Sequence, residues 1–167
     1  MKSRRLALVS VAGVAAAGVL AFSISGAASA ATNGACVLSG TAAFSPGLTV
    51  TASAQTYTFS GSFSNCQGVA GITSGTVLAS GTGSLGCGNG SSSGTAAVTW
   101  SDGSTSTIPF TTTSAAAATE VAGTVSSGTF AGLPAKAVIV FSTSTPQLCA
   151  TTGLTGASFE GPAEIGT

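Results

Sequence analysis

The chain has 167 residues, of which 44% are hydrophobic and only 5% are charged, with four basic and four acidic side chains. This composition argues against an intrinsically disordered chain, which combines low hydrophobicity with high charge, and against a nucleic-acid-binding protein, which needs a basic surface. The chain contains no histidine, so the usual base of nucleophilic catalysis is missing and we expect that the protein is not an enzyme.

Residues 1–30 have the three-part pattern of a secretory signal peptide. A basic start with Arg4-Arg5 precedes an apolar run from Leu6 to Phe22, and Ala28-Ser29-Ala30 forms a cleavage site. The run is shorter than the ~20 apolar residues that a membrane-spanning helix needs. We therefore predict cleavage after Ala30, secretion of residues 31–167 as one extracellular domain, and no membrane span in the mature protein. Export by the general or by the twin-arginine route is left open.

Cleavage would leave Lys136 as the one basic residue, against four acidic residues: Asp102, Glu120, Glu160 and Glu164. Nothing would then neutralise phosphate groups, so we expect neither nucleic acid nor anionic lipid as a partner. We expect Lys136 to lie on an edge strand, where lysine hinders the pairing of one sheet with another. The acidic residues are scattered along the chain and do not indicate a paired catalytic site.

Four cysteines remain after cleavage, and an oxidising compartment predicts two disulfides. Of the three possible pairings we favour Cys36 with Cys66 and Cys87 with Cys149, although the sequence alone does not decide between them. A zinc site is disfavoured because there are no closely spaced cysteine pairs and no histidines.

In the first half of the chain, apolar residues recur at every second position, which is typical of half-buried strands. A first strand that contains Cys36 and Phe44 is expected to end in a turn at Pro46-Gly47. The clearest strand is Gln55–Ser64, with Tyr57, Phe59 and Phe63 on one face and hydroxyl side chains on the other. Further strands are expected at residues 72–79, 119–130, 136–142 and 154–159.

The spacing Gly81-x-Gly83-x-x-Gly86 matches a dinucleotide-binding fingerprint. That fingerprint requires a following helix whose N-terminus faces the phosphates, and here Cys87-Gly88-Asn89-Gly90 follows instead. We therefore expect a loop tethered by Cys87, and no cofactor.

A hairpin is predicted at Asp102-Gly103. Ala96, Val98 and Trp100 share one face of the strand before it, and Ile108 and Phe110 share one face of the strand after it. Asp-Gly between such strands is typical of a type I′ turn. We expect Trp100 to anchor the core. If the domain has a ligand cleft, Trp100 and Phe110 are its candidate residues.

The run Val138–Phe141 is apolar at every position and is expected to form a central strand covered on both faces. Altogether the pattern predicts about nine short strands with glycine-rich turns and no helices between them. Such a pattern indicates an antiparallel sandwich or barrel. We expect an all-β antiparallel β-sandwich, immunoglobulin-like or jelly-roll-like, with two disulfides.

The alanine-rich signal, Cys36-Val37-Leu38-Ser39-Gly40, Phe44-Ser45-Pro46-Gly47-Leu48 and Trp100-Ser101-Asp102-Gly103 together resemble a group of small exported actinobacterial proteins of unknown function. This resemblance implies the fold and the extracellular location only. The chain is also similar in size, acidity and cysteine number to the neocarzinostatin-like apoproteins, which carry small chromophores. Their disulfides close short loops, whereas the cysteine spacings in this chain are long.

Two kinds of function follow. The first is a non-catalytic secreted β-sandwich module that acts through its surface, as a structural protein or by binding an extracellular protein, a glycan or an envelope component. The alternative is a carrier of a small apolar ligand, for which we expect a pocket near Trp100 and the phenylalanines.

Overall fold

The computed structural model describes residues 34–69, 71–116 and 118–166, so the predicted signal peptide lies outside the described residues. All strands belong to one antiparallel sheet. The elements are β1 (Gly34–Leu48), β2 (Ser53–Gln67), β3 (Gly75–Gly86), β4 (Asn89–Trp100), β5 (Thr105–Ala115), β6 (Ala118–Thr124), β7 (Ser127–Gly128), β8 (Pro134–Ser142), the 3-10 helix η1 (Pro146–Ala150) and β9 (Leu154–Ile165).

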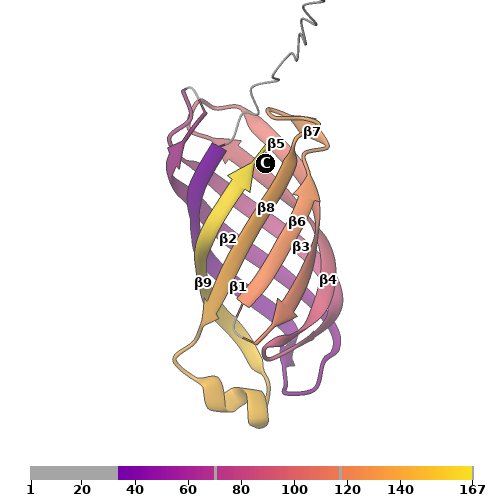
Figure 1. Cartoon of the computed structure of the whole chain (residues 1–167). Coiled ribbons are helices and arrows are strands. Elements are labelled where there is room, and N and C mark those ends of the chain that lie inside the picture. The colour runs from indigo at the N-terminus through magenta and orange to yellow at the C-terminus, as the bar shows by residue number, and fades with distance from the viewer. Residues whose placement is uncertain (1–33, 70, 117, 167) are drawn as a thin grey trace, which may run out of the picture.

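The sheet closes on itself into an eight-stranded antiparallel barrel, which Figure 1 shows from the side of β8. Strands that follow one another in the chain pair with each other, the two-residue β7 lies outside the ring, and β9 pairs with β1. Residues paired from strand to strand can be followed round the barrel from Gln55 of β2 to Cys36 of β1. Cys36 lies opposite residues 64–67 of β2, so the path does not return to Gln55 but ends further along β2. The strands are therefore staggered and tilt across the barrel axis.

The expected β-sandwich, immunoglobulin-like or jelly-roll-like, is wrong. A sandwich has two separate sheets, each with edge strands. Here β4 pairs with β5 and β1 pairs with β9, so a single ring of hydrogen bonds runs through all eight strands. Alternating residues point inward in either architecture, and this is why the sequence pattern did not separate them.

Several strands also differ from their expected bounds. Pro46-Gly47 lies inside β1 rather than in a turn, and the chain turns after Leu48. The glycine motif Gly81–Gly86 lies in β3 and not in a loop. The expected strand 119–130 is divided into β6 and β7, with the buried Val125 between them.

The hairpin between β4 and β5 is confirmed, but its turn is not type I′. Only Gly103 has a positive φ in it, of 83°, and its N–H donates to the carbonyl of Trp100 at 2.9 Å. The carboxylate of Asp102 accepts hydrogen bonds from the hydroxyl and the N–H of Ser104, at 2.7 and 2.9 Å, and these bonds lower the pKa of Asp102. This geometry fits a type I turn followed by a glycine bulge, which also reverses an antiparallel pair.

β8 is not covered on both faces. Ile139 is 1% exposed and faces the interior, whereas Val138 and Val140 are 44% and 50% exposed. Lys136 does not lie on an edge strand either, because β8 is paired with β6 on one side and with β9 on the other. A closed barrel has no edge that a lysine could protect.

Phenylalanine rings and glycines share the middle of the barrel interior. The ring of Phe159 packs 5.4 Å from Phe59 and 6.0 Å from Phe141, centroid to centroid. Gly40 and Gly61 face each other on β1 and β2 and leave the space that this ring occupies. A Cβ atom at Gly40 would lie 2.8 Å from the Cζ atom of Phe159 and 2.3 Å from the carbonyl oxygen of Ser60. The glycines are therefore part of the packing of the core.

We predict that Gly40→Ala destabilises the protein by about 1–3 kcal/mol, since the added methyl group overpacks the core. Gly156→Ala is the matched control, because its nearest atom would be 3.6 Å away. Urea unfolding of both variants measures the difference. Equal midpoints for Gly40→Ala and the control would contradict this account of the packing.

Candidate functional site

A cavity of about 110 Å³ lies inside the barrel. It occupies the end at which β1 begins and β9 ends, which is the upper end in Figure 1 and is called the cavity end below. Each of the eight strands of the barrel contributes residues to its wall. The volume is comparable to that of an engineered cavity of about 150 Å³ that stays dry and accepts benzene.

The cavity exists because inward positions at this end carry small residues. Five alanines line it: Ala79, Ala96, Ala135, Ala137 and Ala163. Towards the middle of the barrel the inward positions carry Phe44, Phe59, Phe141 and Phe159, whose rings pack together and fill the space. Small residues at this end and large rings in the middle of the barrel thus leave this end hollow.

Aromatic rings form part of the cavity wall. The ring of Trp100 lies 5.4 Å from Phe63 and 5.5 Å from Phe130, centroid to centroid. Trp100 is 4% exposed and Phe110 is 7% exposed. Both candidate cleft residues line the cavity, and Trp100 is also part of the core, as expected.

The polar atom of Trp100 is already engaged. Its indole N–H donates to the hydroxyl of Ser106 at 2.8 Å, and Ser106, itself 2% exposed, donates to the carbonyl of Thr129. The next residue, Phe130, has a φ of 70°, which is unusual for a bulky side chain. This chain of hydrogen bonds connects the wall of the cavity to the segment between β7 and β8.

Two charged residues, Lys136 and Glu164, are among the residues around the cavity and lie opposite each other in the register of β8 and β9. Their neighbours Ala135, Ala137 and Ala163 face inward, so the alternation of the strands directs both charged side chains outward, and both residues are exposed. No ionic group therefore enters the cavity from the wall residues that the structure describes.

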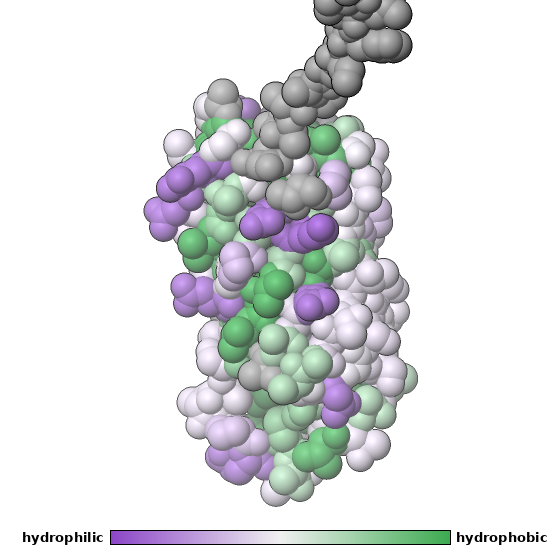
Figure 2. Space-filling model, in the orientation of Figure 1, coloured by the Kyte–Doolittle hydropathy of each residue, from purple (hydrophilic) through white to green (hydrophobic). Residues whose placement is uncertain are grey.

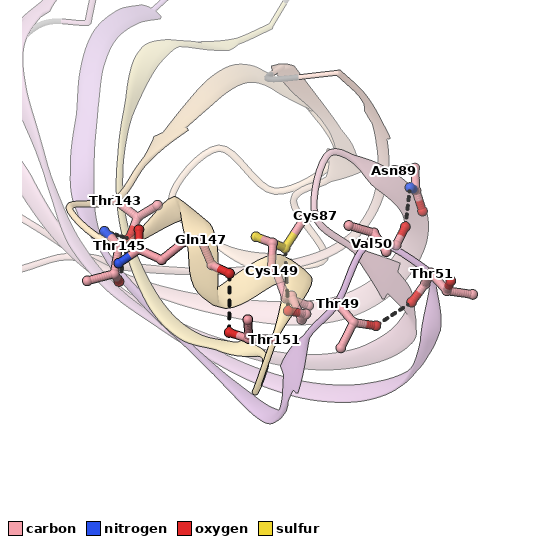
Figure 3. The surroundings of a disulfide bond; sticks show 11 residues. Thr49, Val50, Thr51, Cys87, Asn89, Thr143, Thr145, Gln147, Cys149 and Thr151 are labelled. Atoms are coloured by element: carbon pink, nitrogen blue, oxygen red, sulfur yellow. Dashed lines mark hydrogen bonds between the residues drawn. A yellow bond between two sulfur atoms is a disulfide. The ribbon is translucent and has the colours of Figure 1, made fainter.

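The two disulfides fasten opposite ends of the barrel, in the pairing that the sequence favoured. Cys36–Cys66 joins the start of β1 to the end of β2, and Cys36 lines the cavity. Cys87–Cys149 joins the end of β3 to η1 at the opposite end (Figure 3). There the N–H of Val50 also donates to the carbonyl of Cys149 at 3.1 Å, so the β1–β2 turn is tied to η1.

A polar layer lies inside the barrel below the cavity. The hydroxyl of Tyr57 donates to the carbonyl of Ser93 at 3.2 Å and accepts from Ser92 at 3.0 Å, and Ser92 also bonds to Thr112 at 2.6 Å. Burial raises the pKa of Tyr57. Gln55 is 3% exposed, and its side-chain carbonyl has no hydrogen-bond partner. Neither Tyr57 nor Gln55 lines the cavity.

The described residues contain no group of three or more side chains that could hold a metal ion. Across residues 34–166, apart from 70 and 117, no helix has the length and hydropathy of a membrane span. No family model, no curated protein and no solved structure matches this chain. The fold and the cavity together define the class as an eight-stranded antiparallel barrel with an apolar interior site.

Sequence reasoning identified Trp100 and Phe110 but missed most of the cavity wall. The inward alanines carried the missing signal, since small residues at successive inward positions predict a void when the strands close into a ring. That signal is readable only once closure is known. Phe130 lies in a segment that was expected to continue a strand, so its position at the cavity was not predicted.

We predict that stability falls above about pH 10, because burial raises the pKa of Tyr57 above its unfolded value of 10.0. The stabilisation by neutral Tyr57 is complete below the unfolded pKa and is lost as the pH rises through the folded one. Tyr57→Phe should lose less stability over the same range. Chemical unfolding at pH 8 to 11 measures this, and the absorbance of the single tyrosine reports its pKa directly. Parallel losses in both proteins would refute the assignment.

We also predict that replacing Cys87 and Cys149 together by serine destabilises the protein by about 4 kcal/mol, because this bridge closes a 62-residue separation. Binding of a ligand at the cavity end should persist in the folded variant, since the bridge lies at the other end. Thermal unfolding and the binding assay described below test the two statements separately.

Proposed function

We propose that this protein binds a small, uncharged, apolar molecule inside its barrel and carries it outside the cell after export. The observation that supports this proposal is the cavity of about 110 Å³ whose lining side chains are almost entirely apolar. Removing apolar surface from water favours such binding by about 25 cal/mol per Å². The barrel holds the cavity in shape, so little ordering is needed when the ligand enters.

The size of the cavity limits the ligand to a compact molecule of about one ring. A long acyl chain would require displacement of the packed rings of Phe59 and Phe159, which close the cavity towards the middle of the barrel. The proposed ligand is therefore smaller than a lipid.

Surface binding, the function expected first, has weaker support. Among the described residues, the exposed large hydrophobic side chains are those of Val50, Leu78, Val138 and Val140. Figure 2 shows that on the face around β8 the hydrophobic residues form a narrow band with neutral and hydrophilic residues on both sides. Interaction surfaces usually carry larger contiguous apolar patches.

We predict that toluene binds the folded protein, changes the fluorescence of Trp100, and raises the free energy of unfolding by about 2.7 kcal/mol at a hundred times its Kd. Ala96→Leu should weaken binding by about tenfold or more, since the added carbon atoms occupy the cavity. Ala97→Leu is the matched control, because Ala97 is the next residue and is exposed.

Isothermal titration and thermal unfolding in the presence of toluene, benzene and indole measure these effects. If none of these molecules stabilised the wild-type protein, or if both leucine variants behaved alike, the proposal of a ligand-binding cavity would be wrong.

A further inference from the structure

The wall of the cavity offers almost no hydrogen-bonding group to a bound molecule. Among its side chains only Trp100, Lys136 and Glu164 carry nitrogen or oxygen atoms. The two charged side chains are exposed and point away from the interior. Cys36 contributes only disulfide sulfur. The indole N–H of Trp100 is therefore the one polar side-chain group of the described wall that is buried.

That indole N–H is not free to bind a ligand. It donates a hydrogen bond to the hydroxyl of Ser106 at 2.8 Å, and this hydroxyl donates to the carbonyl of Thr129. A ligand acceptor could reach this N–H only by breaking the bond to Ser106, which would leave the hydroxyl of a buried residue with one partner fewer. We call this chain of hydrogen bonds the Trp100–Ser106–Thr129 relay. Because of it, the one buried polar side-chain group of the wall already has a partner within the protein.

Most of the backbone groups of the wall are also engaged in hydrogen bonds. Its strand residues lie in the ladders that close the barrel, such as Val98 opposite Val77 and Ser106. Phe130 and Val69 come from connecting segments, and their carbonyls accept from the N–H groups of Leu133 and Ile72, at 3.0 and 3.4 Å. A hydroxyl or amine on the ligand would therefore lose its hydrogen bonds to water and find few groups in the wall to replace them.

From this we infer that the site selects hydrocarbons and rejects analogues of the same shape that carry a hydrogen-bonding group, with the Trp100–Ser106–Thr129 relay setting this specificity. This inference rests on the proposed function and names its ligand class. The ligand is a compact hydrocarbon of about one ring or a short branched chain. A buried polar atom without a partner costs about 1–3 kcal/mol, which corresponds to a discrimination of roughly 5- to 150-fold.

The test compares toluene, chlorobenzene and phenol, which have similar size, on the oxidised mature protein at pH 7. We expect chlorobenzene to bind within about fivefold of toluene and phenol to bind on the order of a hundredfold more weakly. Phenol binding within about fivefold of toluene would overturn the inference and leave the proposed function standing. If none of the three bound, both would be wrong.

A polar group introduced into the wall should weaken this preference. Val77 lines the cavity, and Val77→Thr replaces one of its methyl groups by a hydroxyl group. We expect the ratio of the phenol Kd to the toluene Kd to fall by about tenfold in this variant. Val121→Thr provides a second position in the wall, on β6, in case the first variant folds poorly.

Val138→Thr is the matched control, because Val138 is 44% exposed and absent from the wall. Its Kd ratio should equal that of the wild type. An unchanged ratio in both wall variants would overturn the inference, since it would mean that hydrogen bonding inside the cavity does not decide which molecule binds.

Discussion

The pairing of β1 with β9 is the interaction on which the rest of the structure depends. It runs from Gly34 opposite Ile165 to Leu48 opposite Leu154, with an irregularity after Ala43, and it joins the first and last strands of the chain. Without it, both strands would be the edges of an open sheet, with unpaired backbone groups. With it, the inward residues of eight strands face one another across a closed space. The sizes of these inward side chains then decide where the closed interior is filled and where it is empty.

The interior is filled unevenly along its axis. Near the middle, phenylalanine rings fit against glycines, such as Phe159 against Gly40 and Gly61. At the cavity end, five alanines face the axis and leave a space that the aromatic rings of Trp100, Phe63 and Phe130 border without filling. Packing density in protein interiors is usually close to that of organic crystals, so a void of this kind is unusual, and our proposal of a ligand site rests on it.

Local features of the site followed from the sequence, but its shape did not. The alternation around Trp100 and the Asp102-Gly103 pair located the β4–β5 hairpin, and the disulfide pairing that was favoured without being decided is the one that the structure contains. The apolar run Val138–Phe141 predicted a strand covered on both faces, and this prediction was wrong because Val138 and Val140 are exposed although they are aliphatic. The edge strand predicted at Lys136 was also wrong, since a lysine on a strand does not show whether that strand is paired on both sides, as β8 is.

By itself, the sequence determined that this chain forms antiparallel strands with one apolar and one hydroxyl-rich face, because a period of two in residue type is a local property that any observer of the chain can read. The tertiary structure alone decided that the strands close into a barrel, since a sandwich and a barrel require the same alternation and differ only in which distant strands pair. Closure in turn decided that the alanines of β3, β4, β8 and β9 meet around an empty space. These alanines are distant in the chain, and their relative positions are set by the register of the whole ring, so no single segment carries that information.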